Sequence, residues 1–180
     1  MGVFVYRVLG AALLDRGVYE GIEHDHRANI QALTVVVLSS AAAGLGAGGL
    51  YGARPATFLT FTSIALVTWV AWAVLMFQFG TRILPEPQTD TTIGELVRTI
   101  GFAASPGLLQ VFAALPPLAV PVFAITILWM IAAMVVAVRQ ALDYRSTARA
   151  VAVCSLAAGL ALALAVIGGL LFGPAAAMVV

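Results

Sequence analysis

The sequence predicts an all-α, polytopic membrane protein: a helical bundle of five transmembrane helices, preceded by an interfacial amphipathic helix. The first observation behind this prediction is composition, since 62% of the residues are hydrophobic, 9% are charged and the mean hydropathy is +1.06. The second is the placement of the charges, because four long runs contain none. These runs are 28–53, 55–81, 99–138 and 150–180.

Each run is long enough to cross the hydrocarbon core, which takes about 20 helical residues. The third run is roughly twice that length and contains Pro116, Pro117 and Pro121 near its middle, so we interpret it as two crossings joined by a tight turn. Residues 1–180 then form a single integral membrane domain. Its spans are expected near 31–50, 57–79, 100–118, 121–141 and 149–171.

The segment before the first span, residues 1–28, is expected to lie at the cytoplasmic membrane surface. A helix over Phe4–Arg27 would place several apolar side chains on one side. These are Phe4, Val8, Ala11 or Ala12, and Leu14 or Val18.

Orientation follows from the nine arginines, since the chain contains no lysine. Eight of them fall on one side of a five-span chain and only Arg54 falls on the other. The eight are Arg7, Arg16, Arg27, Arg82, Arg98, Arg139, Arg145 and Arg149. By the positive-inside rule we expect a multi-pass protein of the cell (inner) membrane with a cytoplasmic N-terminus and Val180 outside.

Two local patterns concern the third span. Thr92 and Glu95 have the spacing of a capping box, which predicts a helix beginning at Ile93. The tripeptide Ser105-Pro106-Gly107 then predicts an interruption, because proline removes a backbone hydrogen bond. The interruption is either a simple proline kink or a lipid or substrate site.

Small residues recur every four positions in two spans, which is typical of seams where helices pack closely within or between subunits. In the first span they are Ser40, Gly44, Gly48 and Gly52. In the fifth they are Ala157, Ala161, Ala165, Gly169 and Gly173.

Carboxylates and imidazoles gather just before the first span. On a helix Glu20 would share a face with His24, and Glu23 with His26, so a metal site is one reading. The other reading is a solvated acidic surface paired with arginines on the same side of the membrane. This cytoplasmic charge cluster comprises Glu20, Glu23, Asp25, Arg139, Asp143, Arg145 and Arg149.

Several function classes are disfavoured. The sequence has no phosphate-binding loop and no nucleophile with a plausible histidine partner, so we expect neither an enzyme nor a cofactor. The runs contain no deep ionisable residue, which disfavours a proton-coupled transporter. The net charge of +1 indicates no nucleic-acid partner.

Longer motifs carry a resemblance to a known family. They are the stretch Gly94 to Leu109, then Pro116 and Trp129, the stretch Ala137 to Tyr144, and an entry segment from Tyr19 to Asp25 followed by Gln31-Ala32-Leu33. Together they resemble the bacterial branch of the Yip (Ypt-interacting protein) domain family. The resemblance implies five membrane helices and a cytoplasmic N-terminus.

From these observations we expect a non-enzymatic membrane scaffold or membrane-organising protein of Yip type. The alternatives are an accessory subunit of a larger membrane complex and a lipid or small-molecule transporter built around the break at Ser105. The expected partners are membrane lipids and either other membrane protein subunits or a second copy of the chain.

Overall fold

A computed structural model describes the backbone of residues 2–172 and the side chains of residues 2–161 and 163. Every regular element in that part of the chain is helical. In chain order the elements are α1 (Gly2–Ala12), α2 (Arg16–Glu23), α3 (Ala28–Tyr51), α4 (Pro55–Gln78), the π-helix η1 (Phe79–Ile83), α5 (Ile93–Phe102), the 3₁₀-helix η2 (Ser105–Ala114), α6 (Pro116–Ala141) and α7 (Thr147–Phe172).

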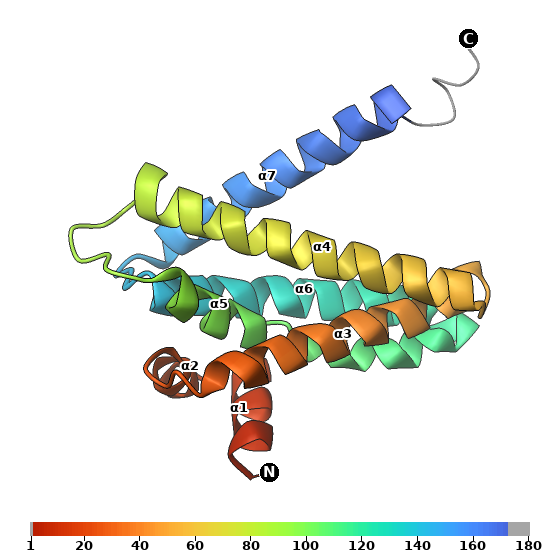
Figure 1. Cartoon of the computed structure of the whole chain (residues 1–180), viewed down its shortest axis with the longest axis horizontal. Helices are drawn as coiled ribbons and strands as arrows, with labels where there is room; N and C mark the ends of the chain where they lie inside the picture. Colours follow the sequence, from red (N-terminus) through yellow and green to blue (C-terminus); the bar gives the residue numbers. More distant parts are fainter. Residues whose placement is uncertain (1, 173–180) are drawn as a thin grey trace.

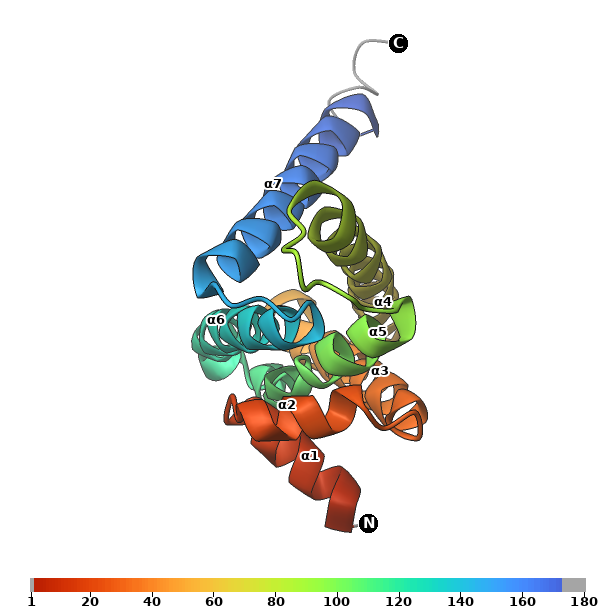
Figure 2. The ribbon, with the colours of Figure 1, turned by 90° about the vertical axis from the view of Figure 1, so that its left-hand side faces the viewer.

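Helices α3, α4 and α6 run side by side along the long axis of the molecule, and α5 with η2 completes this bundle (Figure 1). Viewed along the bundle, α1 and α2 cover one edge and α7 leans away at the opposite edge (Figure 2). Three helices are long and apolar enough to cross a membrane, namely 28–51, 55–83 and 116–141; the bent pair of α5 and η2 would make a fourth. The structure therefore supplies three or four candidate spans in its described residues.

The expected fifth span corresponds to α7, whose backbone is helical through Phe172. Its side chains are described only to Ala161 and at residue 163, so much of the predicted 149–171 span lies outside the described side chains.

The N-terminal segment differs from the single helix expected over Phe4–Arg27. It forms two helices, α1 and α2, because Leu14 takes a left-handed conformation (φ 62°) that ends the first helix. Asp15 then caps the second, its carboxylate accepting from the backbone N–H of Gly17 (2.9 Å) and Val18 (3.3 Å).

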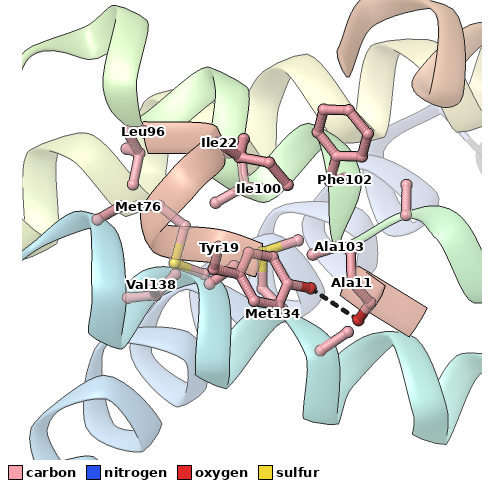
Figure 3. Packing of buried hydrophobic residues seen from close by; sticks show 14 of the residues in the cluster. Ala11, Tyr19, Ile22, Met76, Leu96, Ile100, Phe102, Ala103, Met134 and Val138 are labelled. Atoms are coloured by element: carbon pink, nitrogen blue, oxygen red, sulfur yellow. Dashed lines mark hydrogen bonds between the residues drawn. The ribbon is translucent and has the colours of Figure 1, made fainter. Parts of the chain in front are cut away.

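The apolar side identified in the sequence faces the bundle. Phe4, Val8 and Leu14 are partly buried against the core, and Ala11 and Val18 belong to it. At the centre Tyr19 and Ile22 of α2 lie among core residues from α4, α5 and α6 (Figure 3). Helix α2 therefore packs along one edge of the bundle.

The break in the third span lies where the sequence places it. Helix α5 begins at Ile93 behind the complete Thr92–Glu95 capping box. The chain then bends by 40° and continues as η2 from Ser105, whose hydroxyl donates to the carbonyl of Phe102 (2.5 Å). The serine thus satisfies one of the backbone acceptors that the end of α5 leaves without a helical partner.

The predicted glycine seam in α3 is only partly a seam. Gly44 faces α4, where an added Cβ would collide with Thr62 and the Phe58 carbonyl. Gly48 instead contacts the turn after its own helix at Ala53, and Gly52 is an exposed terminal residue with φ 88°. Within this chain neither residue packs closely against another helix, and Gly52 forms the left-handed helix end. Their role in packing between subunits stays a prediction.

A second glycine face, which the sequence analysis did not single out, packs against η2. An added Cβ on Gly46 would collide with the carbonyl of Gln110, and one on Gly49 with the carbonyl of Ala113. Of the seam expected in the fifth span, Ala157 is buried and Ala161 is partly buried. Ala165, Gly169 and Gly173 lie outside the described side chains.

Candidate functional site

One end of the bundle brings together α2, the first turns of α3 and α5, the last turn of α6 and the first turn of α7 (Figure 1). Many of the charged and polar residues of the chain belong to these segments. The opposite end holds the short α3–α4 turn with Arg54. The charged end is therefore the candidate functional surface, and its geometry is described from the most buried charge outward.

Arg98 is the largest fully buried side chain, with only 1% of its surface exposed. One Nη atom donates to the backbone carbonyl of Glu23 (2.5 Å), and the other to Asn29 Oδ1 (3.2 Å) and His26 Nδ1 (3.3 Å). The carboxylate of Glu95 lies 4.0 Å away. A single guanidinium thus connects the end of α2, the α2–α3 loop, α3 and α5.

These contacts anchor α2 to α5 through Arg98. A buried guanidinium is costly unless its hydrogen bonds are satisfied, so releasing α2 would leave Arg98 without its best acceptor. That acceptor is a carbonyl at the C-terminus of α2, where a cation also interacts favourably with the helix dipole. In the sequence, Arg98 is a cation that bears on topology and a member of the Gly94 to Leu109 stretch. Its burial was not predicted, because burial of an arginine next to a span depends on tertiary contacts.

Glu23 is the second buried charged residue of this end, with 7% of its surface exposed and no partner for Oε2. Its pKa is raised from 4.5 to about 7, chiefly by burial and also by the nearby Asp143 carboxylate, whereas the Gln140 side chain and His24 act in the opposite direction. Glu23 therefore titrates near neutral pH, in contact with α6.

The ion pairs of this surface differ from those expected. Asp25 pairs with Arg7 of α1 (2.6 Å), and Arg7 also donates to Gln31 of α3 (2.9 Å). These contacts lower the pKa of Asp25. In the described residues, neither Asp25 nor the other two acids pairs with the arginines at the end of α6 and the start of α7. Arg7 of α1 is the ion-pair partner of Asp25 instead.

The α6–α7 loop is tied to the segment that follows η1. The Tyr144 hydroxyl lies 2.9 Å from the Gly80 carbonyl and 2.7 Å from that of Leu84, and burial raises the pKa of this phenol to about 12. Glu86 accepts from the backbone N–H of Arg145 (3.1 Å), and the guanidinium of Arg149 lies 3.5 Å from its carboxylate. The loop is thus held by contacts with a segment about 60 residues earlier in the chain.

A match to a family model covers residues 16–169 of this chain: the Yip1 domain. That is most of the 180 residues. The chain belongs to the Yip1 domain family. No curated protein and no solved structure matches it.

The Yip1 domain identified here begins at Arg16, the first residue of α2. Helix α1 lies before the matched residues and is fastened to the domain through its final carbonyls. Ala11 O accepts from the Tyr19 hydroxyl (3.2 Å), and Ala12 O accepts from Trp129 Nε1 (2.7 Å). Members of this family are generally non-enzymatic membrane proteins, in agreement with the apolar helices of this chain.

The metal reading of the acidic segment has no geometric support in this Yip1 domain. Helix α2 ends at Glu23, so Glu23 and His26 do not share a helical face, and His24 Nδ1 lies 2.9 Å from the backbone carbonyl of Glu20. His26 accepts from Arg98. Within the described residues, no group of three or more His, Cys, Asp or Glu side chains is placed to hold a metal ion.

The break after α5 is packed tightly. Ser105, Pro106 and Gly107 are all buried, and an added Cβ on Gly107 would lie 3.0 Å from Met130 Sδ. One turn further on, the buried amide of Gln110 donates to Thr126 Oγ1 (3.2 Å). These contacts are those of a packed helix break.

Proposed function

We propose that this Yip1 domain protein is a non-enzymatic membrane scaffold that organises other membrane components through the outward faces of its helices. The observation that carries the proposal is the exposure of α4. Only Ala73 and Met76 are buried in its 24 residues, whereas Ile64, Val67 and Val70 are all more than half exposed. Such a face is available to lipid and to other helices.

The arrangement of α7 supports the same proposal. This helix packs on α6 and α4 near its first turns and then leans away from the bundle (Figure 1). In the part of α7 whose side chains are described, Val151, Leu156 and Leu160 are exposed, so this helix, like α4, presents apolar side chains to its surroundings. The same surfaces support the alternative, an accessory subunit whose α4 and α7 contact a larger membrane complex.

We further propose five crossings, with α7 as the fifth, in the inner membrane of a bacterium. Helices α3, α4, the α5–η2 pair and α6 supply four, and α7 has 26 helical residues, long enough for another. Eight arginines belong to segments at the charged end of the bundle, and Arg54 lies at the other. This distribution supports a cytoplasmic N-terminus and an external C-terminus.

Site-specific photo-crosslinking tests the proposal in intact membranes. A photo-reactive residue replaces Val67, which is 69% exposed on α4, and the matched control replaces Met76, which is fully buried on the same helix. The scaffold proposal predicts protein adducts from position 67 but not from position 76. Adducts to a second copy favour a self-associating scaffold, and adducts to one foreign chain favour the accessory subunit. Adducts to lipid alone at position 67 and at neighbouring exposed positions would overturn both.

A further inference from the structure

A cavity of about 350 Å³ lies at the charged end, between α2, the end of α6 and the start of α7. Three arginines from three different segments line it: Arg16 of α2, Arg139 of α6 and Arg145 of the α6–α7 loop. The hydroxyl-bearing Thr147, the first residue of α7, lines it as well. The cavity thus offers several hydrogen-bond donors to one bound group.

These arginines differ from those that have acidic partners. Arg7, Arg98 and Arg149 each lie within 4.0 Å of a carboxylate. In the part of the chain that the structure describes, no carboxylate lies that close to the guanidinium of Arg16, Arg139 or Arg145. Arg139 donates to the carbonyls of Tyr144 (3.2 Å) and Arg145 (3.1 Å), which fixes its head at the loop. The cavity therefore gathers three guanidinium groups without an ion-pair partner among the described residues.

One acid opposes this charge. Asp143 also lines the cavity, and burial raises its pKa, with the Asp90 carboxylate adding to the effect. Three guanidinium groups against one carboxylate leave a net positive cavity. An anion is the complementary ligand.

The rest of the lining is apolar and points to the membrane. Val135 and Val136 of α6 also line the cavity. Spacings of three and four residues place Leu128, Ile131, Val135 and Arg139 on one face of α6, and Leu128 and Ile131 are more than half exposed. A continuous strip therefore runs from the charged cavity to the lipid-facing surface of the bundle.

We propose that this cavity binds the phosphate headgroup of an anionic phospholipid, with an acyl chain lying along the α6 strip. This inference deepens the proposed membrane-organising function and rests on it. Because Arg16 belongs to α2 while the other two arginines belong to α6 and its loop, the bound phosphate joins the N-terminal helices to the start of α7. The lipid would be the third contact that holds α2 in place, together with Arg98 and the hydrogen bonds at the end of α1.

The test uses delipidated full-length protein in mild detergent and native mass spectrometry. Dioleoyl phosphatidylglycerol, dioleoyl phosphatidylcholine and inorganic phosphate are titrated separately. The variants are Arg16→Gln and Arg145→Gln, with Arg27→Gln as the matched control. Arg27 is exposed at the same end of the bundle, but it does not line the cavity.

We expect one phosphatidylglycerol to bind more tightly than phosphatidylcholine. Its dissociation constant should rise about fivefold in each cavity variant and stay unchanged in Arg27→Gln. An equal loss of phosphatidylglycerol affinity in all three variants would mean that the lipid is attracted to the overall positive charge of this end, and it would overturn the proposed site. Equal affinities for phosphatidylglycerol and inorganic phosphate would overturn the lipid assignment. Neither failure would alter the Val67 adducts, so the scaffold proposal is tested separately.

Discussion

Substitution of Glu23 by glutamine should stabilise the protein at neutral pH and remove the pH dependence of stability that this carboxyl group contributes. The carboxyl group is buried, one of its oxygens has no partner, and its pKa rises from 4.5 to about 7 on folding. A difference of this size corresponds to about 3 kcal/mol between the two protonation states. The sign follows from linkage: the folded state binds the proton more tightly, so stability falls as pH rises from 4.5 to 7 and is constant above.

The assay is thermal unfolding of the full chain in detergent, followed by tryptophan fluorescence between pH 4.5 and 8. At ~2–4 °C per kcal/mol, the wild-type midpoint should fall by ~5–10 °C across this range because of Glu23, and the glutamine variant should lack this part of the decrease. Exposed Glu20 provides the matched control, and Glu20→Gln should follow the wild-type curve. A Glu23→Gln protein that keeps the wild-type slope, or that is less stable at pH 7.5, would refute the reasoning.

Three further predictions concern the anchor, the helix seam and the topology. Arg98→Gln should lower the free energy of unfolding by about 3 kcal/mol, because it leaves buried acceptors of α2 and α3 without their donor. The control Arg82→Gln, at an exposed position, should change it by no more than about 0.5 kcal/mol. Similar unfolding midpoints for both variants would rule out the anchoring role of Arg98. Gly49→Ala should lower the unfolding temperature of the protein, since the added Cβ would collide with the Ala113 carbonyl, while Gly48→Ala should leave it nearly unchanged. Equal unfolding temperatures for the two variants would mean that α3 and η2 do not pack closely. A periplasmic-type reporter should be active after Val180 and inactive near residue 88. Equal activity at the two sites would contradict five crossings, and the reverse pattern would contradict the cytoplasmic N-terminus.

Features set by local backbone chemistry were predictable from the sequence. The Thr92–Glu95 capping box fixes the start of α5 because it depends only on residues three apart. The interruption at Ser105-Pro106 follows from the missing proline N–H. The division between α1 and α2 was also encoded, since Asp15 before a helical segment is an N-cap signal, but the apolar pattern continues across it and hid the break.

Features set by tertiary contacts were not predictable. Glycines in α3 recur on more than one face, so spacing alone does not tell which face meets a helix; the structure selects Gly44 toward α4 and Gly46 with Gly49 toward η2. Arg98 looks like any arginine beside a span, yet α2 folds over it and buries it. In place of the ion pairs expected for the acidic segment, Asp25 pairs with Arg7, which is distant from it in the sequence but adjacent in the fold.

The central claim is that the outward faces of the bundle bind other membrane proteins. Its most direct test is to extract the protein with a mild detergent or in a polymer disc and to measure the mass of the extracted particle. We predict a particle that contains at least one further protein chain, either a second copy or a different subunit in fixed ratio. That chain should be the one captured from position 67 of α4. A particle containing one copy of this protein and only lipid, in every extraction that preserves its fold, would contradict the claim.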